Sequence, residues 1–192
     1  MKVDRAEVLR YMRMGATQPE PALSARIDEI EKQIAAKCRP SAIWRLEKVT
    51  YHSDGSFNIG DLACRSEKLL KTIEGCNHAF LFCGTIGADI DAFIRRCALV
   101  SGLDALIAQA VSTSLIESFC DECEEKMALE VPGEKLRMRF SPGYGDLPLS
   151  FQKELLAILD TPRKCGVILS EKLLMIPSKS VSAIIGAYKS TE

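Results

Sequence analysis

Apolar side chains recur at helical spacing in the first forty residues of the chain. One helix is predicted to begin after Asp4, whose side chain can cap it, and to end at Gly15. A second helix is predicted from Ala22 to Cys38, and Arg39-Pro40 stops it. The apolar positions that indicate these helices are Val8, Leu9, Met12, Met14, Ile27, Ile30, Ile34 and Ala35. Residues 1–40 are therefore predicted to form a helical N-terminal segment.

The pattern then changes to that of strands. Apolar and aromatic residues favour a strand from Ala42 to Tyr51, and the polar turn at 53–56 leads to a short second strand from Phe57 to Leu62. The continuous apolar run Ala79–Cys83 is typical of a buried strand.

Two helices are predicted in the middle of the chain. A turn at 84–87 leads into the first, and Ser101-Gly102 ends it and caps the second, with Asp104 in the capping-box position. The second helix is predicted to run to about Met127. The residues expected to face inward are Ile90, Phe93, Ile94, Cys97 and Ala98 on the first helix, and Leu103, Leu106, Ile107, Ala110, Val111 and Leu115 on the second.

The last third mixes both kinds of element. A half-exposed strand is predicted from Leu136 to Phe140, a helix from Phe151 to Leu159, and strands at 166–169, 173–176 and 181–188. Helices and strands do not alternate strictly, which favours the α+β class. We expect one domain over residues 1–192, with a twisted antiparallel sheet covered by long helices.

The charge balance limits the classes of partner. The chain has 25 Lys and Arg against 26 Asp and Glu, a net charge of -1, so binding to nucleic acid by bulk electrostatics is not expected. No unbroken run of 18 apolar residues occurs, and no membrane association is expected. The N-terminus is charged and periodic rather than an apolar signal core, so we expect a cytoplasmic protein.

Eight cysteines are scattered through the sequence, several of them inside apolar runs. Reduced thiols that pack as small apolar side chains are the simpler interpretation. The one C-x-x-C pair, Cys120 and Cys123, lies late in a predicted helix, whereas a redox pair should open one. A zinc site would need further ligands, and His52 and His78 are not suitably spaced. No metal site is predicted, and a redox role of the pair stays open as an alternative.

Two features near the central helices, a glycine spacing and a glutamate, each have a structural and a functional interpretation. The spacing Gly84-x-x-Gly87 can hold an anion at a helix N-terminus, or it can be a tight turn between strand and helix, and the tight turn is favoured. Glu117 shares a face of small residues with Ala110 and Thr113, where it lies either at the rim of the core or in a groove. Spacing alone favours the rim.

The segment from Arg139 to Asp146 combines several features of a binding loop. Pro142-Gly143 suits the centre of a type II turn, and glycines let a ligand approach the backbone. Arg139 offers a planar fork for a carboxylate, and Tyr144 offers a ring and a hydroxyl. Composition alone leaves a binding loop and a structural turn equally open.

Two motifs at this end of the chain resemble a known family. The motif R-x-x-P-G-Y at 139–144, followed by S-E-x-x-x-M-x-P-x-x-S-V-S at 170–182, is similar to the activation domain of cobalamin-dependent methionine synthase. Residues 76–87 and 115–119 are similar to its strand-turn and long-helix segments, and the resemblance covers roughly residues 75–186. The family's N-terminal aspartate-tryptophan segment has no counterpart in residues 1–40, and its C-terminal tail has none after Ser182.

The resemblance implies a ligand, a partner and a set of site residues. In the family, this domain binds S-adenosylmethionine and presents it to cobalamin, and one electron and a methyl group then restore methylcobalamin from cob(II)alamin. Carried over, the binding residues are Glu117, Arg139, Pro142, Gly143 and Tyr144. Glu117 is thereby interpreted as a ligand contact rather than a rim residue. We hypothesise that Arg139 pairs with the ligand's carboxylate and that Glu117 faces its ammonium or sulfonium charge.

The expected function is that of a stand-alone activation protein for a cobalamin-dependent methionine synthase or a related corrinoid protein. It would be an accessory component rather than a complete enzyme, with cobalamin supplied by the partner and an electron by a flavodoxin-type reductase. The alternatives are a docking module for a corrinoid protein that does not bind S-adenosylmethionine, and a redox protein that uses Cys120 and Cys123.

Overall fold

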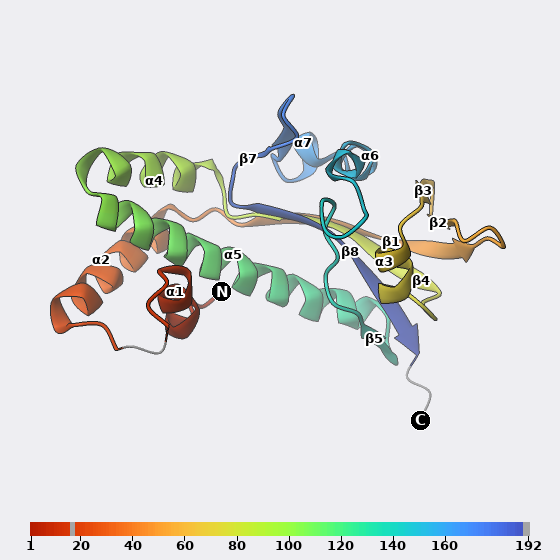
Figure 1. The fold of residues 1–192 in the computed structure, drawn as a ribbon, viewed down its shortest axis with the longest axis horizontal. Helices are drawn as coiled ribbons and strands as arrows, with labels where there is room; N and C mark the ends of the chain where they lie inside the picture. The colour runs from red at the N-terminus through yellow and green to blue at the C-terminus, as the bar shows by residue number, and fades with distance from the viewer. Residues whose placement is uncertain (16–17, 190–192) are drawn as a thin grey trace.

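A six-stranded sheet in the order β3-β2-β1-β4-β8-β5 organises the computed structural model, which describes residues 1–15 and 18–189 (Figure 1). Every neighbouring pair of strands in this sheet is antiparallel. Its strands are β1 (Ser41–Tyr51), β2 (Phe57–Ile59), β3 (Leu62–Cys64), β4 (His78–Thr85), β5 (Glu134–Leu136) and β8 (Ser180–Lys189). A separate hairpin consists of β6 (Ile168–Leu169) and β7 (Met175–Ile176).

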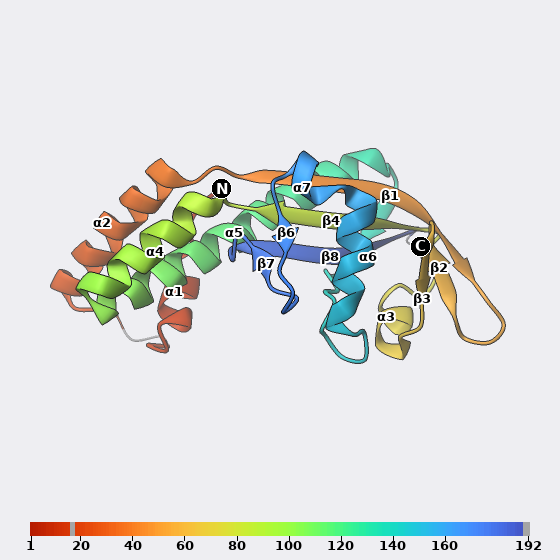
Figure 2. The same cartoon turned by 90° about the horizontal axis from the view of Figure 1, so that it is seen from above.

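Helices cover both faces of the sheet and extend beyond one end of it (Figure 2). They are α1 (Arg5–Tyr11), α2 (Pro21–Lys37), α3 (Glu67–Thr72), α4 (Ala88–Val100), α5 (Gly102–Glu130), the 3-10 turn η1 (Leu149–Phe151), α6 (Gln152–Leu159) and α7 (Thr161–Lys164). This arrangement confirms the predicted α+β class and the antiparallel sheet covered by long helices.

The central strand β4 explains why its sequence is a continuous apolar run. It lies between β1 and β8, and its residues from Ala79 to Thr85 are buried. Because side chains alternate along a strand, Phe80 and Phe82 enter the core under α5, whereas Leu81 and Cys83 enter the core under α6. A strand covered on both faces needs apolar residues at every position.

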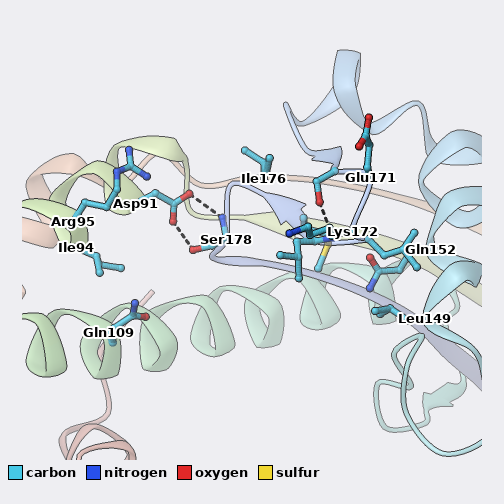
Figure 3. Close-up of a pocket in the computed structure, with 14 residues that line it drawn as sticks. Asp91, Ile94, Arg95, Gln109, Leu149, Gln152, Glu171, Lys172, Ile176 and Ser178 are labelled. Carbon is cyan, nitrogen blue, oxygen red and sulfur yellow. Dashed lines mark hydrogen bonds between the residues drawn. The ribbon is translucent and has the colours of Figure 1, made fainter. Parts of the chain in front are cut away.

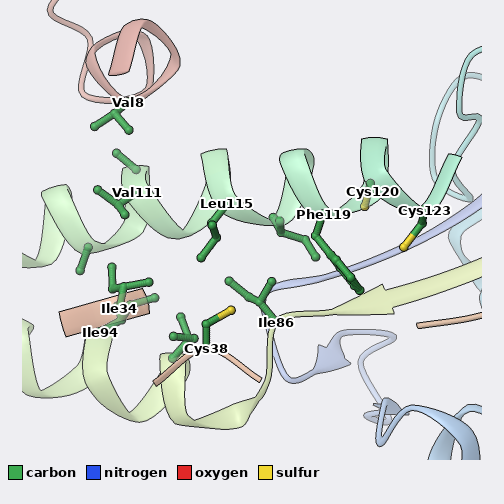
Figure 4. Packing of buried hydrophobic residues seen from close by; sticks show 14 of the residues in the cluster. Val8, Ile34, Cys38, Ile86, Ile94, Val111, Leu115, Phe119, Cys120 and Cys123 are labelled. Atoms are coloured by element: carbon green, nitrogen blue, oxygen red, sulfur yellow. The ribbon is translucent and has the colours of Figure 1, made fainter. Parts of the chain in front are cut away.

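The long helix α5 begins as its capping signal predicts. The Asp104 N–H donates to Ser101 Oγ at 3.2 Å, and the helix continues for 29 residues. Val111, Leu115 and Phe119 form a buried row along it that faces the rest of the core (Figure 4). α5 is thus the main support for one face of the sheet.

Three predicted inward positions at the open end of α4 and α5 are wrong. Leu103 and Leu106 are 49% and 43% exposed, and Ala98 is exposed as well. Apolar residues surround this end of α5 on several sides, and the packing of α2 and α4 covers only some of them. Spacing alone could not decide which side would be covered.

With 29 residues and a high mean hydropathy, α5 is long and apolar enough to cross a membrane. It is the one such helix in residues 1–15 and 18–189. Of its most apolar 18-residue window, 61% is buried inside the protein. This apolar surface is therefore used largely in the core, as in other buried helices.

The strand predicted from Leu136 to Phe140 is wrong over most of its length. β5 ends at Leu136, and beyond it the Arg137 N–H donates to the Gly186 carbonyl and Phe140 exchanges two hydrogen bonds with Ile184. The backbone between these contacts leaves the ladder, as in a β-bulge. Arg139 consequently turns towards α5, while Phe140 enters the core on the other face.

The first helix, α1, ends at Tyr11 rather than at the predicted Gly15. Further differences involve short elements. The strand predicted at 57–62 is the hairpin of β2 and β3, and the six-residue helix α3 and the four-residue helix α7 have no predicted counterpart. Helices of one or two turns are too short to show a clear apolar period.

Candidate ligand-binding site

A tight turn at residues 141–144 lies beside the sheet edge that Phe140 occupies. The Tyr144 N–H donates to the Ser141 carbonyl at 3.1 Å, and Gly143 has a φ of 89°. These features confirm the type II turn predicted from Pro142-Gly143. A side chain at Gly143 would be strained by the positive φ, and its Cβ would lie 3.1 Å from Leu149 Cδ1.

The turn is anchored to α3 through Asp146. Its carboxylate accepts hydrogen bonds from Ser66 Oγ at 2.5 Å, from the Glu67 N–H at 2.7 Å and from the Lys68 N–H at 3.3 Å. The Ser66 hydroxyl is the main cause that lowers the pKa of Asp146, and the backbone N–H groups add to it. The position of the turn therefore depends on the start of α3.

Tyr144 is the exposed residue of this turn. Tyr144 is 68% exposed, and its ring and that of Phe140 form a T-shaped pair with a centroid distance of 5.6 Å and an interplanar angle of 82°. The ring is thus held on one side and remains accessible on the other.

Arg139 brings the strand side of the site together with α5. Its guanidinium lies 2.9 Å from the Glu117 carboxylate, 2.9 Å from that of Asp121 and 2.5 Å from that of Glu124. These three acidic residues are four and three positions apart, so they project from one face of the helix. We call Arg139, Glu117, Asp121 and Glu124 the arginine-carboxylate cluster.

The arginine-carboxylate cluster carries more negative than positive charge. With all three carboxylates ionised, one guanidinium leaves a net charge of -2 (one minus three). Burial lowers the pKa of Arg139, but the hydrogen bond to Asp121 and the charge of Glu124 outweigh this, and the pKa is raised overall. Burial raises the pKa of Glu124 despite the nearby Arg139. The cluster therefore favours a cation over an anion as a further partner.

A groove with a volume of about 980 Å³ adjoins the turn (Figure 3). It lies between α4, α5, η1, the start of α6 and the β6–β7 hairpin, and Leu149 contributes both to its lining and to the contact with Gly143. Gln109 enters it from α5. At its end near α4, the Asp91 carboxylate accepts hydrogen bonds from the N–H and the hydroxyl of Ser178.

Sequence comparison connects this geometry with a known family. The profile described as vitamin B12 dependent methionine synthase, activation domain, matches residues 70–192, which is more than half of the chain. The chain belongs to this family. The family match confirms the resemblance inferred from the two C-terminal motifs, and it contains all five predicted site residues of this activation domain.

Comparison with solved structures extends the likeness beyond the matched segment. The crystal structure of the MetH reactivation domain bound to AdoHcy has a TM-score of 0.69 to the present structure and 13% sequence identity, and the alignment covers 99% of this chain and 75% of that one. At this identity the likeness concerns the fold. No curated protein sequence matches the chain.

Four of the five predicted site residues of the activation domain form two groups, which the short segment from Arg139 to Tyr144 connects. Glu117 and Arg139 form an ion pair, and Gly143 and Tyr144 form the exposed side of the turn that follows Phe140. Pro142 is buried and shapes the turn. The structure adds Asp121 and Glu124, which sequence reasoning missed although their spacing from Glu117 placed them on the same helix face.

Lys179 is a further residue that sequence reasoning missed. It occupies an unspecified position between Pro177 and Ser180 of the second motif, and its Nζ donates to Thr113 Oγ1 at 2.8 Å and to the Gln109 carbonyl at 3.4 Å. The sequence feature that could have identified it is a charged lysine in a segment of apolar and small residues. It places a cation on the α5 face that also carries Glu117.

In the activation domain, Gly84 and Thr85 still belong to β4, and the tight turn into α4 is formed by Ile86 and Gly87. Gly87 has a φ of 96°, and a Cβ there would lie 3.1 Å from the Arg39 carbonyl oxygen. Asp89 and Asp91 occupy the first turn of α4 and would repel an anion at its N-terminus. The structure therefore favours the structural interpretation of this spacing.

Cys120 and Cys123 lie on the buried face of α5 (Figure 4). Burial raises the pKa of Cys120 to about 12 and that of Cys123 to about 11, so both are protonated thiols at neutral pH. Within residues 1–15 and 18–189, no group of three His, Cys, Asp or Glu residues is placed to hold a metal ion. The pair packs as small apolar side chains.

Proposed function

We propose that this activation domain binds S-adenosylmethionine and presents it to a cobalamin-dependent methionine synthase or a related corrinoid protein. It acts as a separate chain in the cytoplasm and supports the reductive remethylation of cob(II)alamin on that partner. A flavodoxin-type reductase supplies one electron, the ligand supplies the methyl group, and S-adenosylhomocysteine is the product. The observation that carries the proposal is the net negative arginine-carboxylate cluster beside an exposed glycine turn, in a chain of this family.

The charge of the cluster fits the ligand. S-adenosylmethionine has a permanent positive charge on sulfur and an ammonium group, and the cluster has carboxylate charge that Arg139 does not balance. The Glu117 side chain is 44% exposed, so its carboxylate can contact a ligand while it keeps the bond to Arg139. Asp121 and Glu124 accept hydrogen bonds from Arg139 Nη1, whereas Glu117 accepts from Nη2.

The turn fits the uncharged part of the same ligand. Gly143 and Tyr144 are exposed, so their backbone groups can approach a nucleoside closely, and the accessible face of Tyr144 can stack on a flat base. The anchor at Asp146 keeps this surface in place before the ligand arrives. Preorganisation of this kind reduces the entropy lost on binding.

The contribution of this chain to the reaction is binding and orientation. When bound, S-adenosylmethionine supplies an electrophilic methyl group. Glu117 holds the cationic part of the ligand, Arg139 fixes Glu117, and the turn holds the nucleoside, so that the methyl group has a defined direction. Transfer of a methyl group from a sulfonium requires no proton from the protein, so this chain need not supply a catalytic acid or base. Its role is that of an accessory component that binds and orients the methyl donor.

Calorimetric titration of the protein with S-adenosylmethionine tests the proposal. We expect saturable binding that Glu117→Gln weakens about 10- to 100-fold, the range for loss of a charged hydrogen bond. Glu125→Gln is the matched control, because Glu125 is an exposed carboxylate on the same helix. S-adenosylhomocysteine, which lacks the sulfonium charge, should bind the wild type more weakly than S-adenosylmethionine does, and Glu117→Gln should reduce that difference.

Absence of binding in the wild type would contradict the proposal and favour the alternative function. In that alternative, the chain docks on a corrinoid protein without a methyl donor. The exposed apolar side chains of the β6–β7 hairpin, Leu174 at 62% and Ile176 at 47% exposure, would then be the surface to test for docking.

A further inference from the structure

Lys179 immediately precedes β8, and its side chain is directed to α5. Its Nζ donates to Thr113 Oγ1 at 2.8 Å, and the Gln109 carbonyl oxygen is 3.4 Å away. Both partners are neutral. Gln109 also lines the groove (Figure 3). The Lys179 ammonium therefore lies beside a residue that forms part of the groove wall.

No carboxylate of residues 1–15 and 18–189 lies within ion-pair distance of Lys179. The acidic group whose charge influences its pKa is Asp91, which is already bound to the N–H and the hydroxyl of Ser178. Lys179 is partly buried, and this burial lowers its pKa. The ammonium of Lys179 is partly desolvated and has only neutral partners. It can therefore form a charged hydrogen bond with an anionic group of a ligand.

Opposite charges lie one helical turn apart on this face of α5. Thr113, which holds Lys179, and Glu117, which holds Arg139, are at i and i+4, so their Cβ atoms are about 5–6 Å apart. A ligand across this face would meet a cation at one end and a net negative cluster at the other. An amino acid whose side chain carries a sulfonium has the matching charges, since its carboxylate is separated from the sulfur by a short carbon chain.

We propose that Lys179 binds the carboxylate of the methionyl part of S-adenosylmethionine and thereby selects ligands that carry this carboxylate. The inference rests on the proposed function, and it differs from the hypothesis that Arg139 pairs with the carboxylate. Arg139 already has three carboxylate partners, and a fourth would meet the excess negative charge of Glu117, Asp121 and Glu124. Arg139 is a positioning residue for Glu117.

The test is a cycle of two ligands and two proteins. S-adenosylmethionine and decarboxylated S-adenosylmethionine differ by the carboxylate and share the sulfonium, the amine and the adenosine. Each is titrated calorimetrically into the wild type and into Lys179→Gln. We expect the substitution to weaken S-adenosylmethionine about 10- to 100-fold and to change the affinity for the decarboxylated ligand less than about twofold.

Three further variants separate this role from a structural one. Lys179→Arg keeps the charge and should restore part of the preference for the carboxylate. Lys153→Gln, at an exposed lysine of α6, is the matched control and should bind both ligands as the wild type does. Glu117→Gln should weaken both ligands by a similar factor, because both carry the sulfonium.

Two outcomes would overturn the inference while leaving the proposed function intact. Equal weakening of both ligands by Lys179→Gln would assign Lys179 a structural role, and unchanged affinity for both would remove it from the site. If the wild type binds neither ligand, the proposed function itself is overturned, and the inference with it.

Discussion

Arg139 shows how a single residue can be structural and functional at once. Sequence reasoning assigned it to a ligand because it sits in an alternating segment beside a glycine turn. The structure shows three carboxylate partners on α5, the nearest in sequence 15 positions away. The types of residue in the site were therefore predictable, but their mutual contacts depend on how the segment after β5 crosses α5, which no local pattern encodes.

Substitution of Arg139 tests this dual role through stability. Arg139→Gln should lower the free energy of unfolding at pH 7, because the three carboxylates then face one another without a positive charge between them. The expected loss is about 1–3 kcal/mol, between the values for exposed and buried ion pairs. Glu124 already has a raised pKa, and removal of Arg139 should raise it further. For a carboxylate with a raised pKa, destabilisation is largest above that pKa and is relieved as the pH falls through it.

Urea unfolding of the wild type and Arg139→Gln at pH 7 and near pH 4.5 measures this difference. The loss of stability should be smaller at the lower pH. An equal loss at both values would mean that Arg139 stabilises the protein through packing alone.

Elements were predictable to the extent that they have a long, regular pattern. The strand β4 and the helices α2, α4 and α5 were found because each continues its period over many residues and has a clear capping or stop signal. The helix α3 was missed because it has only six residues, although Ser66 caps it locally by accepting a hydrogen bond from the Leu69 N–H. Asp146, 79 positions after Glu67, adds a second contact to its N-terminus that no local pattern indicates.

The bond between Asp146 and α3 leads to a prediction at the scale of the element. Asp146→Asn should lower the thermal midpoint and weaken S-adenosylmethionine binding, because the start of α3 and the turn at 141–144 lose a common anchor. The folded-state pKa of Asp146 is lowered, so its contribution to stability is present above the unfolded-state pKa and is lost as the pH falls through the folded-state pKa.

Thermal unfolding of both proteins at pH 7 and pH 3 provides the measurement. The two midpoints should differ at pH 7 and approach each other at pH 3. A difference that stays the same at both pH values would show that the negative charge of Asp146 is not what anchors the turn.

At the scale of the whole molecule, one sheet and one long helix carry all parts of the site. α5 supplies Glu117 and the support for Lys179, Lys179 immediately precedes β8, and the segment between β5 and α6 supplies Arg139 and the turn. These segments are far apart in sequence and meet because β8 pairs with both β4 and β5. A ligand held there lies at the edge of the sheet, where a second protein can reach it.

The central claim is that the chain recognises a corrinoid protein that needs remethylation. It is tested most directly by measuring the affinity of the chain for one corrinoid partner in its cob(II)alamin and methylated forms, with S-adenosylmethionine present. We predict tighter binding of the cob(II)alamin form, because an activation protein can shift the partner towards the reactivation complex only through such a preference. Equal affinity for the two forms would contradict the account.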